Sequence, residues 1–137
     1  MFKKVNYELA ITNYKFLVMK KDNVIQTKSY NFAVRMVKLY KHLSQEKKEF
    51  VLSKQLLRSG TSIGANVEEA IGGQSRKDFF AKLTIAYKEA RESHYWIRLL
   101  KDTDFLSDKE SESLLKDIEE ILKIIGSIQK TIRNTKS

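Results

Sequence analysis

Residues that could carry acid–base or metal chemistry are few in this chain. It holds two histidines, His42 and His94, and no cysteine, so metal ligands and proton carriers at neutral pH are scarce. A di-iron helical bundle needs a Glu-x-x-His on each of two helices, and neither histidine follows a glutamate by three residues. No Ser-His-Asp set, phosphate-cradling glycine loop or dinucleotide fingerprint has a usable spacing. We therefore predict a protein that is not an enzyme and has no catalytic, cofactor or metal site.

Polar chemistry is concentrated instead in residues 58–75, where small and polar side chains repeat at helical spacing. Steps of four, four and three residues put four of them on one helix face: Arg58, Ser62, Asn66 and Glu69. A separate apolar stripe has a period of about 3.6 residues: Leu56, Ile63, Val67 and Ala70. The pattern predicts a buried helix, and the spacing of Gly60 and Gly64 permits close approach of another helix.

Start and stop signals place this segment among four helices. The expected N-caps are serines, two of them with an acidic residue three positions on: Ser29, Ser53, Ser75 before Asp78, and Ser107 before Glu110. Gly72-Gly73 ends the second helix, and residues 44–49 and 102–106 are the expected loops. Helices joined by such short connections pack as antiparallel neighbours.

Apolar seams on these helices predict how they pack. The third helix alternates steps of four and three through Phe79, Leu83, Ala86, Ala90, Ser93, Ile97 and Leu100. The fourth continues the seam through Leu114, Ile118, Ile121, Ile125, Ile128 and Ile132. We therefore predict an all-α fold, an antiparallel up-down-up-down four-helix bundle over residues 19–134 with a tail at 135–137. Residues 1–18 alternate in hydropathy about Thr12-Asn13, which favours a hairpin extension or a mis-assigned start.

Composition limits the class of protein and its partners. The 137 residues contain no proline and no run long enough for a membrane span of roughly 20 apolar residues, so we expect a single cytoplasmic domain with no membrane role. The net charge of +9 comes from residues 1–60, which hold 13 Lys or Arg against 4 acids, whereas residues 61–137 hold 13 against 13. Such a basic front suits phosphate backbones, although Lys-rich helix surfaces also serve solubility.

Three separated motifs carry a resemblance to a known family. They are Gln55-Leu-Leu-Arg-Ser-Gly-Thr-Ser-Ile-Gly-Ala-Asn-Val-Glu-Glu-Ala70, Ser75-Arg-Lys-Asp-Phe79, and Ile85-Ala-Tyr-Lys-Glu-Ala-Arg-Glu-Ser-His-Tyr-Trp96. In this order and spacing they closely resemble the 23S rRNA intervening-sequence protein family of bacterial four-helix bundles, over about residues 19–132. Members are similar in fold to the accessory protein of diversity-generating retroelements. That similarity implies a homopentamer, contact with a reverse transcriptase and association with RNA or other nucleic acid.

The family's polar positions match this chain at Arg58, Ser62, Asn66, Glu69 and Glu92, and Trp96 lies in the third motif. We interpret these six residues as structural and assembly positions. Arg58 is expected to be held by Glu69 or Glu92, and Ser62 and Asn66 to bond across to a neighbouring helix or subunit. Trp96 beside the seam is expected to be core or subunit interface.

Phosphate contact is expected on basic residues of the first helix, of the loop after it and of the start of the second helix: Arg35, Lys38, Lys41, Lys47, Lys48 and Lys54. Two alternatives remain. The chain is a protein-partner adaptor whose basic surface is only solvated, or it is a ribonuclease. For the latter, Arg35 and His42, with six residues between them, match in outline the Arg-x4-6-His pair of the HEPN ribonucleases, in which His is acid or base beside a phosphate-binding Arg.

Overall fold

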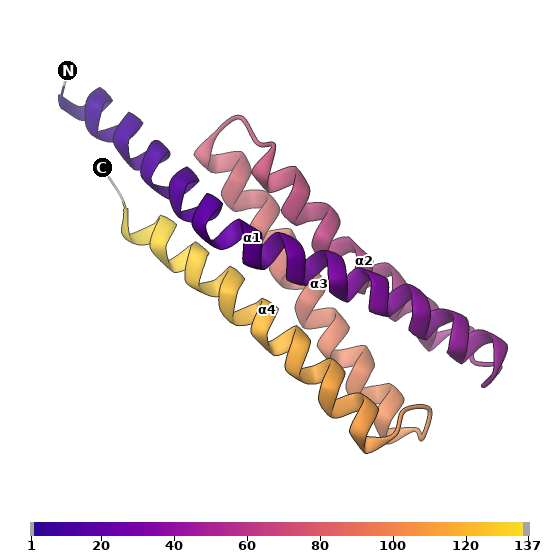
Figure 1. The fold of residues 1–137 in the computed structure, drawn as a ribbon. Helices are drawn as coiled ribbons and strands as arrows, with labels where there is room; N and C mark the ends of the chain where they lie inside the picture. The colour runs from indigo at the N-terminus through magenta and orange to yellow at the C-terminus, as the bar shows by residue number, and fades with distance from the viewer. Residues whose placement is uncertain (1, 136–137) are drawn as a thin grey trace.

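The computed structural model describes the backbone of residues 2–135 and the side chains of residues 24–135. It contains four helices: α1 (Phe2–Gln45), α2 (Leu52–Ile71), α3 (Arg76–Asp102) and α4 (Asp108–Asn134). Each helix packs against the next one in the chain, and α4 packs against α1, which closes a ring (Figure 1). No described residue forms a strand. The all-α four-helix bundle predicted from the apolar seams is confirmed.

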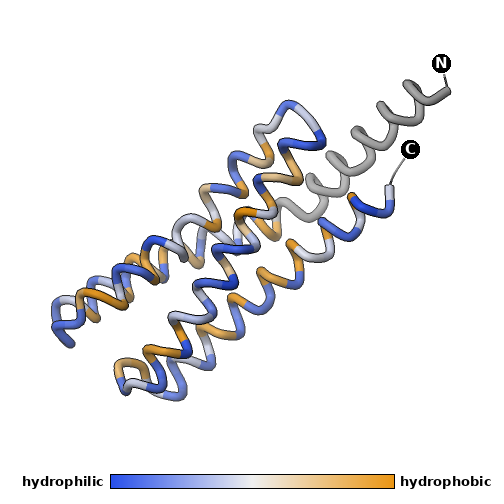
Figure 2. Tube along the Cα trace, turned by 180° about the vertical axis from the view of Figure 1, so that it is seen from behind, coloured by the Kyte–Doolittle hydropathy of each residue, from blue (hydrophilic) through white to orange (hydrophobic). Residues whose placement is uncertain are grey.

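The core lies where the predicted seams meet. All seven seam positions of α3 and all six of α4 are buried. The α2 stripe is buried in full, and Phe32, Met36 and Leu43 bring the apolar face of α1 against it. Figure 2 shows apolar colour on the sides of the helices that face one another and polar colour on the outward sides. Burial of these stripes is the main stabilising term, since isolated helices gain little from propensity alone.

The hairpin predicted for residues 1–18 is wrong, because α1 runs back to Phe2. Residues 2–45 contain neither glycine nor proline, so nothing in the sequence stops a helix there. Thr12-Asn13 also lacks the glycine that two-residue hairpin turns favour. Ser29 is therefore not an N-cap but a buried residue inside α1, where its hydroxyl donates to the Gln26 carbonyl oxygen over 3.2 Å.

The start of α2 is capped by a carboxylate, whereas the sequence pattern predicts Ser53 as the cap. The Glu49 carboxylate accepts hydrogen bonds from the backbone N–H groups of Val51 (3.1 Å), Leu52 (2.9 Å) and Ser53 (2.7 Å). The Ser53 hydroxyl donates back to the Glu49 carbonyl oxygen over 2.7 Å. The long glutamate side chain reaches over the first turn and satisfies donors that a serine would leave open.

The caps predicted at Ser75 and Ser107 are confirmed. Ser75 accepts a hydrogen bond from the Asp78 N–H at 3.1 Å, at the start of α3. Ser107 and Glu110 form a reciprocal capping box at the start of α4, with both hydrogen bonds 3.1 Å long. α2 ends at Ile71, directly before Gly72-Gly73, as predicted. The local signals thus place three of the helix ends correctly.

The glycines of α2 allow α1 and α2 to come close. A Cβ atom added at Gly60 would lie 2.4 Å from Met36 Cγ, and one at Gly64 would lie 3.3 Å from the Ser29 carbonyl oxygen. Gly126 in α4 differs, because its added Cβ would be 3.9 Å from the Tyr87 ring, an ordinary contact. A glycine inside a helix costs about 1 kcal/mol relative to alanine, so packing explains Gly60 and Gly64 but not Gly126.

Acid should weaken the cap of α2. Burial raises the pKa of Glu49, but hydrogen bonds from the Ser53, Leu52 and Val51 N–H groups outweigh it and hold the pKa below its ordinary value of 4.5. The carboxylate therefore stabilises the fold fully above pH 4.5, and this contribution is lost as the pH falls through the lowered pKa.

We expect Glu49→Gln to lower the free energy of unfolding by about 1 kcal/mol at pH 7, with a gap to the parent that narrows toward pH 3. Urea denaturation across this pH range measures the gap. Glu46→Gln is the control, because Glu46 is exposed and its side chain forms no ion pair with a described residue. A gap for Glu49→Gln that stays constant with pH would contradict the cap.

Alanine at two glycines should act with opposite signs. Gly60→Ala overpacks Met36 and is expected to lower the free energy of unfolding by about 1 kcal/mol, because overpacking outweighs the gain in helix propensity. Gly126→Ala meets no close atom and should raise it by up to about 1 kcal/mol. Thermal melts followed by circular dichroism compare the two. If both variants raised the free energy of unfolding by the same amount, an added methyl group would fit between α1 and α2 without overpacking.

Candidate nucleic-acid interface

Five of the six cations predicted to contact phosphate lie at one end of the bundle. Lys38 and Lys41 are in the last turns of α1, Lys47 and Lys48 are in the connection, and Lys54 is in the first turn of α2. All five are exposed, and none forms an ion pair with a residue that the structure describes. These lysines, which we call the α1–α2 lysines, therefore keep their ammonium groups available to a polyanion.

Arg35, the sixth, is engaged within the bundle. Its Nη1 lies 2.5 Å from Asp117 Oδ2, and its Nη2 donates to the Ser113 hydroxyl over 3.1 Å. Lys28, seven residues earlier on α1, also forms an ion pair with α4. Its Nζ lies 2.5 Å from Glu120 Oε2, and this ammonium lowers the pKa of Glu120. The two ion pairs join α1 to α4, so a phosphate on Arg35 would have to compete with Asp117.

The start of α4 brings acidic charge toward this end of the bundle. The Ser107 hydrogen bonds hold the pKa of Glu110 below its ordinary range, and the nearby His42 and Lys47 side chains lower it further. His42 is exposed and lies on this side of α1, whereas the Arg35 guanidinium is bound by Asp117. The two residues of the ribonuclease alternative therefore do not present a free cation beside a free imidazole.

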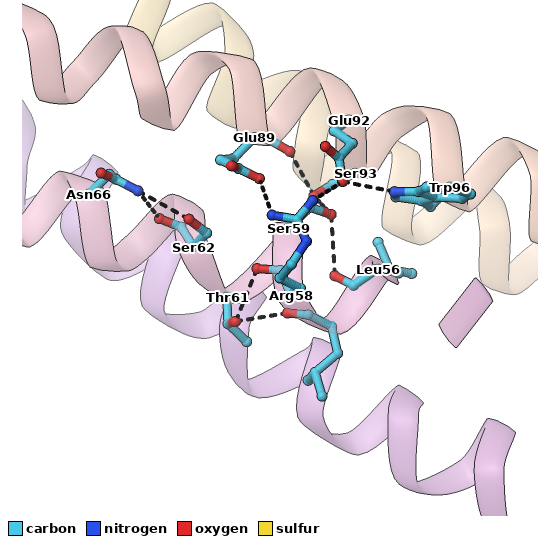
Figure 3. A network of polar contacts seen from close by, with 11 residues as sticks. Leu56, Arg58, Ser59, Thr61, Ser62, Asn66, Glu89, Glu92, Ser93 and Trp96 are labelled. Atoms are coloured by element: carbon cyan, nitrogen blue, oxygen red, sulfur yellow. Dashed lines mark hydrogen bonds and ion pairs between the residues drawn. The ribbon is translucent and has the colours of Figure 1, made fainter. Parts of the chain in front are cut away.

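The polar face of α2 builds a network with α3, shown in Figure 3. The Arg58 guanidinium pairs with Glu92, and its Nη1 lies 3.4 Å from Glu89 Oε2. Glu92 Oε2 also accepts a hydrogen bond from the Trp96 indole N–H at 3.0 Å. Of the two expected carboxylate partners, Glu92 holds Arg58, whereas Glu69 lies 3.6 Å from Lys82.

The Arg58 network lies at the surface and not in the core, which corrects the expectation of a buried helix face. The Arg58 side chain is 52% exposed and that of Glu92 is 38% exposed. The buried polar contact is one residue away, where the hydroxyls of Ser59 and Ser93 lie 2.9 Å apart and both residues are fully buried. A surface pair contributes about 0–1 kcal/mol, so Arg58 is less important to folding than a buried arginine would be.

Ser62 and Asn66 bond to each other and not across to another helix of the same chain. Asn66 Nδ2 donates to the Ser62 carbonyl oxygen at 2.8 Å and to its hydroxyl at 3.1 Å, both within α2 (Figure 3). Four residues on one helix bring these groups together, so no second element is needed. Trp96 packs against the core while its indole N–H faces Glu92, consistent with the expected structural position.

Sequence reasoning missed an exposed apolar stripe on α1. Tyr30, Val34 and Val37 are 66%, 37% and 42% exposed, and their steps of four and three put them on one face. Lys38 and Lys41 adjoin this stripe in the sequence. The signal was the 4–3 spacing of a second apolar set, separate from the set that begins at Phe32.

Comparison with known proteins decides the family. The sequence pattern of the family described as 23S rRNA-intervening sequence protein matches residues 21–127. The chain belongs to this family. A solved structure of a protein of unknown function from the S23 ribosomal protein family of Bacteroides thetaiotaomicron is 56% identical, with a TM-score of 0.79. The match covers 80% of this chain and 98% of that one. None of the curated proteins compared with the chain matches it.

Membership of the 23S rRNA-intervening sequence protein family agrees with the resemblance drawn from the three sequence motifs. The matched range includes all five α1–α2 lysines and the whole Arg58 network. In the described part of the chain, no helix is long and apolar enough to cross a membrane. No group of three or more His, Cys, Asp or Glu side chains gathers among the same residues as a metal-binding set would.

The Arg58–Glu92 pair should contribute little to stability but should report through Trp96, the single tryptophan. We expect Arg58→Ala to cost about 1 kcal/mol or less, since the pair is largely exposed. Glu92→Ala also removes the acceptor of the indole N–H and should shift Trp96 fluorescence to longer wavelength as water replaces it. A double-mutant cycle, with stabilities measured by urea denaturation, gives the coupling free energy between Arg58 and Glu92. Coupling of several kcal/mol would mean that this surface is covered in solution.

Proposed function

We propose that this protein is a non-enzymatic, oligomeric interaction module that binds RNA, alone or in a ribonucleoprotein, through the α1–α2 lysines. The observation that supports this most is that these exposed lysines lack carboxylate partners among the described residues. Residues 24–60 hold 8 Lys or Arg against 2 acids, Glu46 and Glu49. The Glu49 carboxylate accepts hydrogen bonds from N–H groups of α2, so it neutralises little of the positive charge that the lysines present to solvent.

Lysines of this kind act as point charges. They position a phosphate backbone and do not read base edges, so the proposed binding has little sequence preference. It also depends steeply on salt, because each neutralised phosphate releases a counterion. The family description refers to intervening sequences of 23S rRNA, which makes RNA the first ligand to test.

Assembly is part of the proposal. The resemblance drawn from the sequence motifs implies a fold similar to the accessory protein of diversity-generating retroelements, and on that expectation we propose a homopentamer and contact with a protein partner such as a reverse transcriptase. The exposed stripe of Tyr30, Val34 and Val37 supports a protein contact on α1, since it offers apolar area beside lysines.

The same stripe favours the alternative function, a protein-partner adaptor with no nucleic-acid role. In that case the α1–α2 lysines only solvate the surface. The two functions differ in how RNA affinity responds to the removal of lysines, whereas both predict an oligomer. The ribonuclease alternative is left without specific support, since Arg35 is held by Asp117.

Charge removal should separate the two functions. For Lys47→Gln with Lys48→Gln, we expect weaker binding to a labelled RNA of any sequence and a salt slope smaller by about 0.7–0.9 for each phosphate that is no longer neutralised. Gel shifts or anisotropy across about 50–200 mM salt measure both quantities. Light scattering on the same samples reports whether the oligomer is unchanged.

The matched control removes the same charge elsewhere. Lys116 and Lys123 on α4 are exposed and have no ion pair with a described residue, and two acids, Glu119 and Glu120, lie between them in the sequence. Lys116→Gln with Lys123→Gln should leave affinity nearly unchanged. Equal losses of RNA affinity in the two double variants would show that only the net charge matters. If the parent protein had no affinity for any RNA, the protein-partner adaptor would be the function that remains.

A further inference from the structure

A groove between α3 and α4 lies away from the α1–α2 lysines. It has a volume of about 510 Å³, within the range of roughly 300–1,000 Å³ for small-molecule sites. From α3 it is lined by Thr84, Tyr87, Lys88 and Arg91. From α4 come Gly126, Gln129 and Arg133. The lining thus combines cations, an aromatic ring and an amide.

The cations of the groove are not neutralised by any carboxylate in the described part of the chain. Lys88, Arg91 and Arg133 form no ion pair with a described residue, and Arg133 lies over the Phe80 ring with 5.4 Å to its centroid. Residues 121–135 of the chain contain no acid. The α3 acids nearest in sequence, Glu89 and Glu92, both face Arg58 on the α2 side of α3. Three uncompensated charges around one concave surface favour an anion.

A buried amide in the groove has an acceptor that no described residue uses. Gln129 is only 6% exposed, and its Nε2 donates to the Thr84 hydroxyl at 3.1 Å. That hydroxyl donates its own proton to the Phe80 carbonyl oxygen over 2.8 Å, so Thr84 accepts from the amide. No described residue donates to Gln129 Oε1. A buried acceptor without a donor is uncommon, and a ligand hydroxyl or N–H would satisfy it.

Gly126 keeps the space beside Tyr87 open. The atom nearest to a Cβ added at this position is Tyr87 Cε2 at 3.9 Å, so no close backbone approach requires the glycine. A larger side chain here would extend into the groove and against the tyrosine ring. The absence of a side chain at residue 126 therefore leaves an aromatic surface on which a flat ring can lie.

We propose that the α3–α4 groove binds a nucleoside phosphate. Its phosphate contacts Lys88, Arg91 and Arg133, its base lies against Tyr87, and one of its hydroxyl or N–H groups donates to Gln129 Oε1. The nucleotide is either free or part of a single-stranded RNA. The groove uses other helices than the α1–α2 lysines, so it stands independently of the proposed function.

Calorimetric titration of the full chain with adenosine 5′-monophosphate tests the site. We expect saturable binding, with adenosine and inorganic phosphate each at least about tenfold weaker, because each lacks half of the contacts. Arg91→Gln should weaken binding of the nucleotide by about tenfold or more, as expected for a charge-assisted contact. Gly126→Leu should do the same by filling the groove while it keeps every charge.

Gly126→Ala is the matched control, since it adds one methyl group at ordinary contact distance and should keep affinity within about threefold. Lys47→Gln with Lys48→Gln should leave the nucleotide affinity unchanged, which separates this site from the proposed function. Circular dichroism melts check that each variant is folded. Arg91 is exposed, so its variant retains the fold even if Gly126→Leu does not.

A single-stranded oligoadenylate identifies the source of the nucleotide. Displacement of the oligonucleotide from the groove by the mononucleotide assigns the site to RNA, and simultaneous binding assigns it to the free nucleotide. The proposal is overturned if neither ligand saturates at millimolar concentration. Affinity that is the same in the parent, Arg91→Gln and Gly126→Leu would also overturn it.

Discussion

The close contact of α2 with both of its neighbours is the constraint on which the bundle depends. On one side Gly60 and Gly64 let α1 approach until Met36 and the Ser29 carbonyl fill the space. On the other, the hydroxyls of Ser59 and Ser93 meet with no exposed surface. Small residues at these positions permit backbone distances that larger side chains would prevent. The small and polar residues of α2 therefore serve chiefly as a packing surface.

Ion pairs at the surface also join neighbouring helices, and they determine which charged side chains have no partner. α1 and α4 are linked by Lys28–Glu120 and Arg35–Asp117, so two acids of α4 are used there. The α2–α3 edge uses Glu89 and Glu92 on Arg58. The lysines at the α1–α2 end form no ion pair with a carboxylate among the described residues. A count of charges along the chain, such as the 13 cations and 13 acids of residues 61–137, does not show which individual charges are paired, because pairing depends on local contacts.

Two basic surfaces of different character result. The α1–α2 lysines are exposed point charges at one end of the bundle, and charges of this kind can position a phosphate backbone without reading its sequence. The α3–α4 groove is lined by an aromatic ring and a buried amide as well as by cations, and such a mixed lining is typical of small-molecule sites. The apolar stripe of Tyr30, Val34 and Val37 is a third surface, with the character of a protein contact. All three surfaces lie on a four-helix bundle of the 23S rRNA-intervening sequence protein family.

Periodicity and capping are local signals, so the four helices, the seams of α3 and α4 and the caps at Ser75 and Ser107 could be predicted from the sequence, as could the resemblance to the family. The packing of the helices set which charged side chains became partners. Arg35 met Asp117, Arg58 met Glu92 and not Glu69, and Glu49 replaced Ser53 as the cap. It also assembled the α3–α4 groove from residues about 40 positions apart. Such contacts depend on the rotation and offset of packed helices, which spacing within one helix does not contain.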